Sequence, residues 1–223
     1  MHIPGYASKF MSALVYISQH LLTMSESKKQ QVLELLKRSG VLRPRDLRPL
    51  GISGVYLNKL FAQGVLDRPS RGLYTLADSE PSENRSIVEA AKLVPNGAIC
   101  LLSALRFHNL TTESPFEVWL AISRKARLPK VDYPVLRIVR YSGEAISFGL
   151  QVHEIEGVEV RVYSPAKTVA DCFKYRNKIG LDVAIEALRD CLSQRKATVD
   201  ELWAAAKVCR MSNVIRPYLE AVR

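Results

Sequence analysis

The stretch GISGVYLNKLFAQGVLDRPSRGLYTL, residues 51–76, decides the fold of the N-terminal part of the chain. Ser53 is placed to cap a helix that runs towards residue 64. The pattern that follows predicts two short strands, and the turn residues between them include Arg68 and Arg71. A helix followed at once by a basic hairpin is typical of the second half of a winged helix-turn-helix.

Two further helices are expected before this stretch. The first begins at Ser25, carries an apolar stripe and ends at Gly40. Pro44 is placed in the first turn of a second, short helix that stops near Gly51. Three short helices and a basic hairpin, in this order, predict a winged helix-turn-helix domain over residues 24–78.

The third helix has two different faces. Leu57, Leu60 and Phe61 share the side that we expect to face the core. A recognition helix lies in the major groove with its N-terminal residues towards the base edges. The residues expected to read bases from the opposite side are Val55, Tyr56, Lys59 and Gln63. The alternative is that these side chains only form a solvated helix face.

The chain is basic, with a formal net charge of +10, which favours an anionic partner such as nucleic acid. Residues 24–74 hold ten Lys and Arg against four Asp and Glu. Phosphate contacts supply affinity and salt dependence but carry no sequence information. The residues expected to make them are Lys28, Lys29, Arg43, Arg45, Arg48, Arg68 and Arg71. Double-stranded DNA is therefore the expected partner of the N-terminal domain.

A polar, turn-rich segment at residues 77–86 predicts a domain boundary, with a second domain over residues 79–223. The expected elements are helices at 87–94 and 98–110, strands at 118–122, 136–141, 150–155 and 158–163, and helices again from Ser164. This order predicts an α+β fold, in which the second domain is a mixed α/β domain with an antiparallel sheet flanked by helices.

No motif in the second domain predicts a catalytic, metal or cofactor site. Glu154 and Glu159 come nearest to a nuclease-type metal site, but they lie in a predicted hairpin, where alternating charges are typical of a solvated sheet face. Lys167 and Asp171 are four residues apart on a predicted helix, which favours a local ion pair over catalysis. We therefore expect a protein that is not an enzyme and that needs no cofactor.

One stretch of the second domain is strongly basic. Residues 123–141 contain six Arg and Lys and a single acidic residue, Asp132. The candidate functional surface consists of Arg124, Lys125, Arg127, Lys130, Arg137 and Arg140. It is expected to bind an anionic partner, unless it is only a charged loop with solvent-facing strand positions.

The cysteines and the first residues bear on where the protein works. The four cysteines are widely separated and lack zinc-ligand spacing, which predicts reduced thiols and a cytoplasmic protein. No apolar run approaches the length of a membrane span, so no membrane partner is expected. Residues 1–23 allow two interpretations: a start-site artefact ahead of Met24, or an amphipathic helix that covers the next domain.

Three segments together carry a family resemblance. They are the hairpin ending RGLYTL, LLSALRFHNLTTESPFEVWLAI at 101–122, and VYSPAKTVADCFKYRNKIGLDVAIEALRD at 162–190. The most specific residues are Ser103, Ala104, Leu105 and His108, followed by Ser164, Pro165, Ala166, Lys167, Thr168 and Asp171. With these segments, most of residues 25–220 resemble AbiEi-type antitoxins of bacterial type IV toxin-antitoxin systems.

The resemblance implies two roles. The N-terminal domain would repress its own operon at inverted repeats, and the second domain would counteract a nucleotidyltransferase toxin. Gly54 departs from the family pattern, in which a basic residue is frequent early in the recognition helix, and this bears on base preference and affinity. Two other classes stay open: a winged-helix module that mediates protein contacts, and a nucleic-acid-processing enzyme with an unrecognised site.

Overall fold

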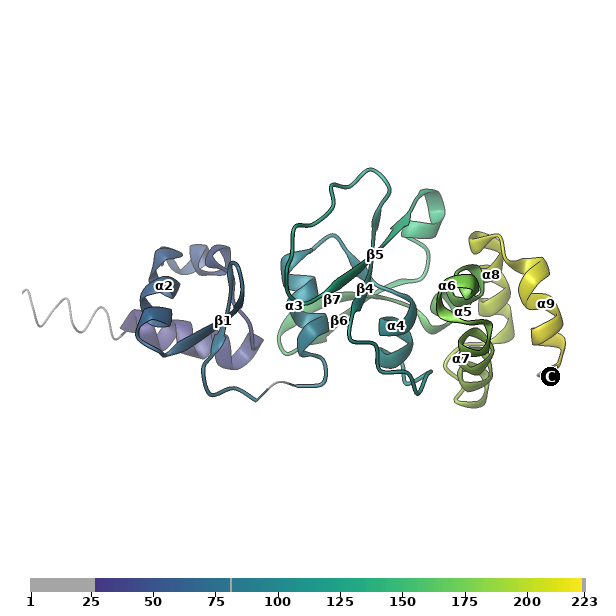
Figure 1. The fold of residues 1–223 in the computed structure, drawn as a ribbon, viewed down its shortest axis with the longest axis horizontal. Helices are drawn as coiled ribbons and strands as arrows, with labels where there is room; N and C mark the ends of the chain where they lie inside the picture. Colours follow the sequence, from purple (N-terminus) through teal and green to yellow (C-terminus); the bar gives the residue numbers. More distant parts are fainter. Residues whose placement is uncertain (1–26, 81, 222–223) are drawn as a thin grey trace, which may run out of the picture.

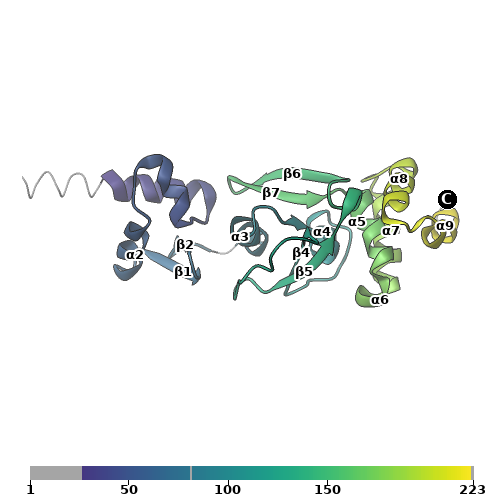
Figure 2. The same ribbon diagram turned by 90° about the horizontal axis from the view of Figure 1, so that it is seen from above.

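The computed structural model describes residues 27–80 and 82–221 and gives an elongated molecule in three parts (Figure 1). A small domain of helices and a two-stranded hairpin lies at one end, a five-stranded sheet lies in the middle, and a group of helices lies at the other end (Figure 2). Both interpretations of residues 1–23, and the expected helix start at Ser25, lie outside the described residues.

The N-terminal domain has the expected order of elements. A helix over residues 27–39 is followed by η1 (Pro44–Leu50), α2 (Val55–Ala62), β1 (Leu66–Ser70) and β2 (Leu73–Leu76). The second helix is a 3-10 helix that starts with Pro44, whose fixed φ suits a first helical turn. β1 and β2 pair antiparallel, with Leu66 opposite Leu76. The helix-turn-helix-like fold with a C-terminal hairpin is thus confirmed.

One side chain of α2 lies elsewhere than expected. Leu57 and Leu60 are buried in the core of the N-terminal domain, but Phe61 is 43% exposed. Successive helix residues are rotated by about 100°, which carries Phe61 past the edge of the narrow stripe that Leu57 and Leu60 define. The core position expected for Phe61 is therefore wrong.

The second domain is built on a sheet with two buried faces. Its strands are β3 (Ala98–Ile99), β4 (Val118–Ser123), β5 (Leu136–Tyr141), β6 (Leu150–Ile155) and β7 (Val158–Tyr163), in the spatial order β5-β4-β3-β7-β6. The helices α3 (Arg85–Leu93) and α4 (Leu101–Phe107) flank β3 in the sequence. Alternation along β4 sends Trp119 and Ala121 to one apolar core and Leu120 and Ile122 to another. The mixed α/β domain is confirmed.

The sheet is mixed, not antiparallel as expected. β3 pairs antiparallel with β4 and β6 with β7, but β3 with β7 and β4 with β5 are parallel. The loop after Ser123 carries the chain back along the sheet before β5 begins, so β4 and β5 run the same way. β3 is only two residues long and lies within the segment expected to be helical, so the expected helix at 98–110 begins later, at Leu101.

Helices complete the chain after the sheet. They are α5 (Pro165–Lys174), α6 (Arg176–Ile179), α7 (Leu181–Ser193), α8 (Val199–Cys209) and α9 (Ser212–Ala221). Ser164 caps α5 as expected, because its side chain accepts a hydrogen bond from the Lys167 amide. Thr198 and Glu201 form a capping box at α8. η2 (Gly143–Ile146), which joins β5 to β6, packs against α8.

The N-terminal domain docks on the sheet domain. Val41 and Leu73 are fully buried and join the apolar core formed by α3 and one face of the sheet. The turn between β6 and β7 fits closely against the end of the helix over 27–39, since a Cβ at Gly157 would lie 2.6 Å from the Arg38 carbonyl oxygen. The Lys92 ammonium forms an ion pair with Asp46 at 2.8 Å. The polar segment at 77–86 therefore connects two parts that are in apolar contact.

Candidate nucleic-acid interface

The residues expected to read bases lie on the outer face of α2. Val55 is 71% exposed, and Lys59 and Gln63 are also exposed. Tyr56 is half-buried against the core, and the Lys59 ammonium lies 5.9 Å from the centroid of its ring. The cation thus lies on an aromatic side chain, which holds it at the helix surface.

Asn58 lies on the same exposed side of α2, and the sequence analysis missed it. The Tyr74 hydroxyl, on β2, donates a hydrogen bond to Asn58 Oδ1. This bond fixes the amide group, while its NH₂ group still has donors for an acceptor outside the protein. Asn58 is three residues after Val55, a helical spacing that the sequence already contained.

The two arginines of the hairpin face different surroundings. Arg71 is exposed at the turn beside Gly72, which adopts a φ of 77°. Arg68 instead lines a cleft of about 530 Å³ together with Phe61 and Tyr133, between the hairpin and the second domain. Arg71 is therefore the hairpin arginine that is exposed and does not line this cleft.

The other basic residues expected to contact phosphate also separate into two groups. The Arg43 guanidinium donates to the carbonyl oxygens of Lys92 and Leu93 at the end of α3, and burial lowers its pKa. Arg45 donates to the same Lys92 carbonyl at 3.3 Å. In contrast, Arg48, in η1, is exposed and has no ion pair within the described residues. Lys28 is exposed and Lys29 half-buried near the start of the first helix.

The basic stretch of the second domain is partly structural. Arg140 donates to the carbonyl oxygens of residues 123, 124 and 126 and so holds the loop that follows β4. Arg137 forms an ion pair with Glu117 at 3.3 Å and lies over the Trp119 ring. The four remaining residues are exposed on the loop between β4 and β5: Arg124, Lys125, Arg127 and Lys130. They form the loop surface that is open to an anionic partner.

The Lys167 and Asp171 pair is a local ion pair, as expected, but it is completely buried. The Lys167 ammonium lies 4.5 Å from the Tyr141 ring centroid and 4.6 Å from that of Tyr163. The Cys209 thiol donates to Asp171 Oδ1 at 3.1 Å. Burial, followed by the charge of Asp171, raises the pKa of Tyr141 well above its ordinary value. The pair thus joins β5, β7, α5 and α8 in one polar cluster inside the core.

His108 lies in the segment at 101–122, which also carries the family resemblance. It contacts Tyr163, as Lys167 does. Its Nε2 atom lies 2.7 Å from the Tyr163 carbonyl oxygen, which also accepts a hydrogen bond from the Thr168 hydroxyl. Burial lowers the pKa of His108, which favours its neutral form. These residues hold α4 and α5 to the end of β7.

Several expectations about chemistry can be compared with the described residues. Within residues 27–80 and 82–221, no group of three or more His, Cys, Asp and Glu side chains is arranged to hold a metal ion. The four cysteines are free thiols and buried, and burial raises the pKa of Cys100 and Cys172. In that same part of the chain, no helix has both the length and the apolar character to cross a membrane.

The N-terminal part of the chain matches the model of a known family. Residues 30–77 match the family model described as "Transcriptional regulator, AbiEi antitoxin". The matched segment extends from the first helix through the hairpin, and it confirms the predicted family resemblance for this part of the chain. The match supports a DNA-binding antitoxin at the level of the family. A comparison with curated proteins gives no match.

Proposed function

We propose that this protein is an antitoxin that represses its own toxin-antitoxin operon by binding inverted repeats in the promoter. The observation that supports this most directly is the exposed face of α2, next to a hairpin with an exposed arginine, in the segment that matches the regulator family. α2 would lie in the major groove, with Val55, Tyr56 and Lys59 towards the base edges and Gln63 further along. Asn58 joins this set.

Phosphate contacts would surround the reading helix. Arg71 is the strongest of the seven residues for this role, because it is exposed at the tip of the hairpin. Arg48 is also exposed, but it lies in η1 and lines a cleft that includes Lys92 and Gly157 of the second domain. Lys28 and Lys29 remain in the proposal, at the start of the first helix. Arg43 and Arg45 contribute less, since their guanidinium groups bind the end of α3. Arg68 faces the cleft towards Tyr133.

The second domain would supply the antitoxin activity, by counteracting a nucleotidyltransferase toxin. The support for a distinct role is the loop between β4 and β5, which presents Arg124, Lys125, Arg127 and Lys130 to solvent. A cluster of four exposed cations on a loop with a single acidic residue, Asp132, attracts anionic partners by long-range electrostatics. Arg140 supports this loop from β5, whereas Arg137 pairs with Glu117 ahead of β4.

Binding of the full chain to its own upstream DNA tests the proposed repressor function. In a gel-shift series at fixed salt, labelled promoter DNA should be retarded, and unlabelled promoter DNA should compete at least about 1,000-fold better than random DNA of equal length. The salt dependence should be steep, because phosphate contacts release counterions. Equal competition by promoter and random DNA would remove sequence-specific repression from the proposal.

A charge reversal tests the antitoxin role of the loop. The triple variant Arg124→Glu, Lys125→Glu and Arg127→Glu should lose growth rescue when the neighbouring toxin is expressed, because the loop would then repel an anionic partner. Promoter repression should remain, since these residues are outside α2 and the hairpin.

The matched control reverses three exposed cations elsewhere on the second domain: Arg161, Arg189 and Lys196. This variant changes the net charge by the same amount and should rescue growth as the unchanged protein does. Protein levels are compared by immunoblot, since a misfolded variant would also fail to rescue. Full rescue by the loop variant would show that the basic loop is only a solvated surface.

A further inference from the structure

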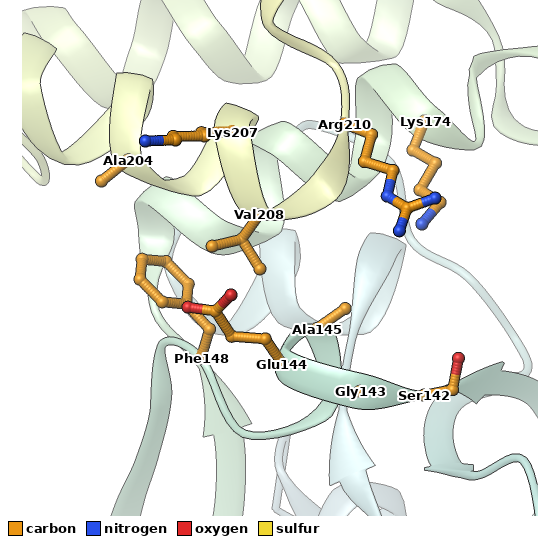
Figure 3. Close-up of a pocket in the computed structure, with 10 residues that line it drawn as sticks. All are labelled: Ser142, Gly143, Glu144, Ala145, Phe148, Lys174, Ala204, Lys207, Val208 and Arg210. Atoms are coloured by element: carbon orange, nitrogen blue, oxygen red, sulfur yellow. The ribbon is translucent and has the colours of Figure 1, made fainter.

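A further basic site lies at the far end of the molecule from α2. It is a cleft of about 760 Å³ between η2 on one side and the ends of α5 and α8 on the other (Figure 3). Its volume falls in the range of ordinary small-molecule sites. Neither the segment that matches the regulator family nor the basic loop after β4 contributes a residue to its lining.

Three cations line this cleft: Lys174, Lys207 and Arg210. All three are exposed, and none forms an ion pair within residues 27–80 and 82–221. Figure 3 shows the charged ends of Arg210 and Lys174 directed to the same end of the cleft, where Ser142 also lies. Two like charges that converge on an open cleft repel each other, and a bound anion removes that repulsion.

Taken one at a time, the presence of each cation is explained by its position at the end of a helix. Lys174 is the last residue of α5 and Lys207 lies in the last turn of α8, where the helix dipole favours positive charge. The dipole does not explain why two different helices direct their cations into one hollow, across from the Ser142 hydroxyl (Figure 3). That convergence is typical of a site for a phosphate group.

The opposite end of the cleft has a different character. Phe148 and Val208 supply an apolar surface there, and the Glu144 carboxylate extends in front of them (Figure 3). An aromatic face suits a planar base, and a carboxylate accepts hydrogen bonds from sugar hydroxyls. Lys207 extends along the same end of the cleft, away from Arg210.

We propose that this cleft binds a nucleoside polyphosphate. Arg210, Lys174 and the Ser142 hydroxyl hold the phosphates, Glu144 accepts from the ribose, and Phe148 contacts the base. A nucleic-acid strand is the less suitable source of phosphate, because strand-binding grooves carry cations and aromatic residues along an extended path. Here the cations lie in one concave hollow with a single aromatic residue.

Isothermal titration calorimetry with the full chain tests this site. ATP, GTP, CTP and UTP are titrated separately, next to inorganic tripolyphosphate, adenosine and a single-stranded DNA oligonucleotide. At least one nucleoside triphosphate should bind saturably and more tightly than tripolyphosphate. Lys174→Gln and Arg210→Asn should each weaken its binding by at least about tenfold, the loss expected for a hydrogen bond to a charged group. Asn suits position 210 because the residue there is left-handed, with a φ of 59°.

Two further variants make the result specific. Phe148→Leu keeps an apolar side chain but removes the aromatic face, so it should weaken nucleotide binding and leave tripolyphosphate binding unchanged. Arg189→Gln removes one exposed charge of α7 outside the cleft and should leave all affinities unchanged. Absence of triphosphate binding, equal affinity for tripolyphosphate and nucleotides, or tighter binding of the oligonucleotide through the same residues would each overturn the proposal. Promoter binding, measured in parallel, should not change in any of these variants.

Discussion

Lys167→Met should lower the free energy of unfolding by about 3–5 kcal/mol, because it leaves the Asp171 carboxylate charged and unpaired inside the core. Both side chains are almost completely excluded from solvent. Methionine is unbranched and only one heavy atom shorter than lysine, so loss of volume is small and the cost comes from the orphaned charge. The Cys209 thiol, a weak donor, is a poor replacement for the ammonium group.

Urea unfolding followed by circular dichroism measures this effect. Lys174→Met, on the same helix but exposed, is the matched control and should change stability by no more than about 0.5 kcal/mol. The double variant Lys167→Met with Asp171→Leu should recover most of the loss, since apolar pairs often replace buried ion pairs at little cost. A single-variant loss below about 1 kcal/mol would contradict the burial of the pair.

Lys59→Ala should change which bases the protein prefers, whereas Arg71→Ala should weaken binding to every sequence alike. Lys59 lies on the exposed face of α2, where a good base contact contributes about 1–3 kcal/mol of discrimination. Arg71 is at the tip of the hairpin, where we expect it to contact a phosphate of the bound duplex. Its removal should also lower the slope of log affinity against log salt by about one.

Competition with a library of operator variants, repeated at several salt concentrations, separates these effects. Tyr56→Phe is a useful companion variant, because it retains the ring that lies under the Lys59 ammonium and removes only the hydroxyl. A change of base preference in Arg71→Ala, together with unchanged preference in Lys59→Ala, would move the reading surface from α2 to the hairpin.

Local patterns were sufficient to predict most elements of the fold. The strands expected at 136–141, 150–155 and 158–163 have those bounds in β5, β6 and β7, because alternation with period two and clear turn residues delimit them. β3 was missed since two residues are too few for any periodicity. The parallel pairing of β4 with β5 was missed because pairing depends on contacts between distant segments, which one sequence does not contain.

The candidate site was predictable by residue type but less so by environment. The exposure of Val55 and Lys59 follows from helical periodicity. The burial of Lys167 does not, because a lysine within an apolar pattern is normally assigned to the surface. Its aromatic neighbours come from β5 and β7, which precede its helix in the sequence. The contact of Arg43 with α3 likewise joins residues about fifty positions apart, so charge alone assigned it to phosphate.

The docking of Val41 and Leu73 on the sheet domain has a consequence for operator geometry. Because these contacts are already made, the reading helix and the basic loop keep one relative orientation before any partner binds, and no ordering entropy is lost at that step. Two copies on the proposed inverted repeat would then act as rigid bodies. Moving one half-site by about 5 base pairs, half a turn of the duplex, would place the second copy on the opposite side of the DNA, and the buried contacts of Val41 and Leu73 would oppose the rotation needed to compensate.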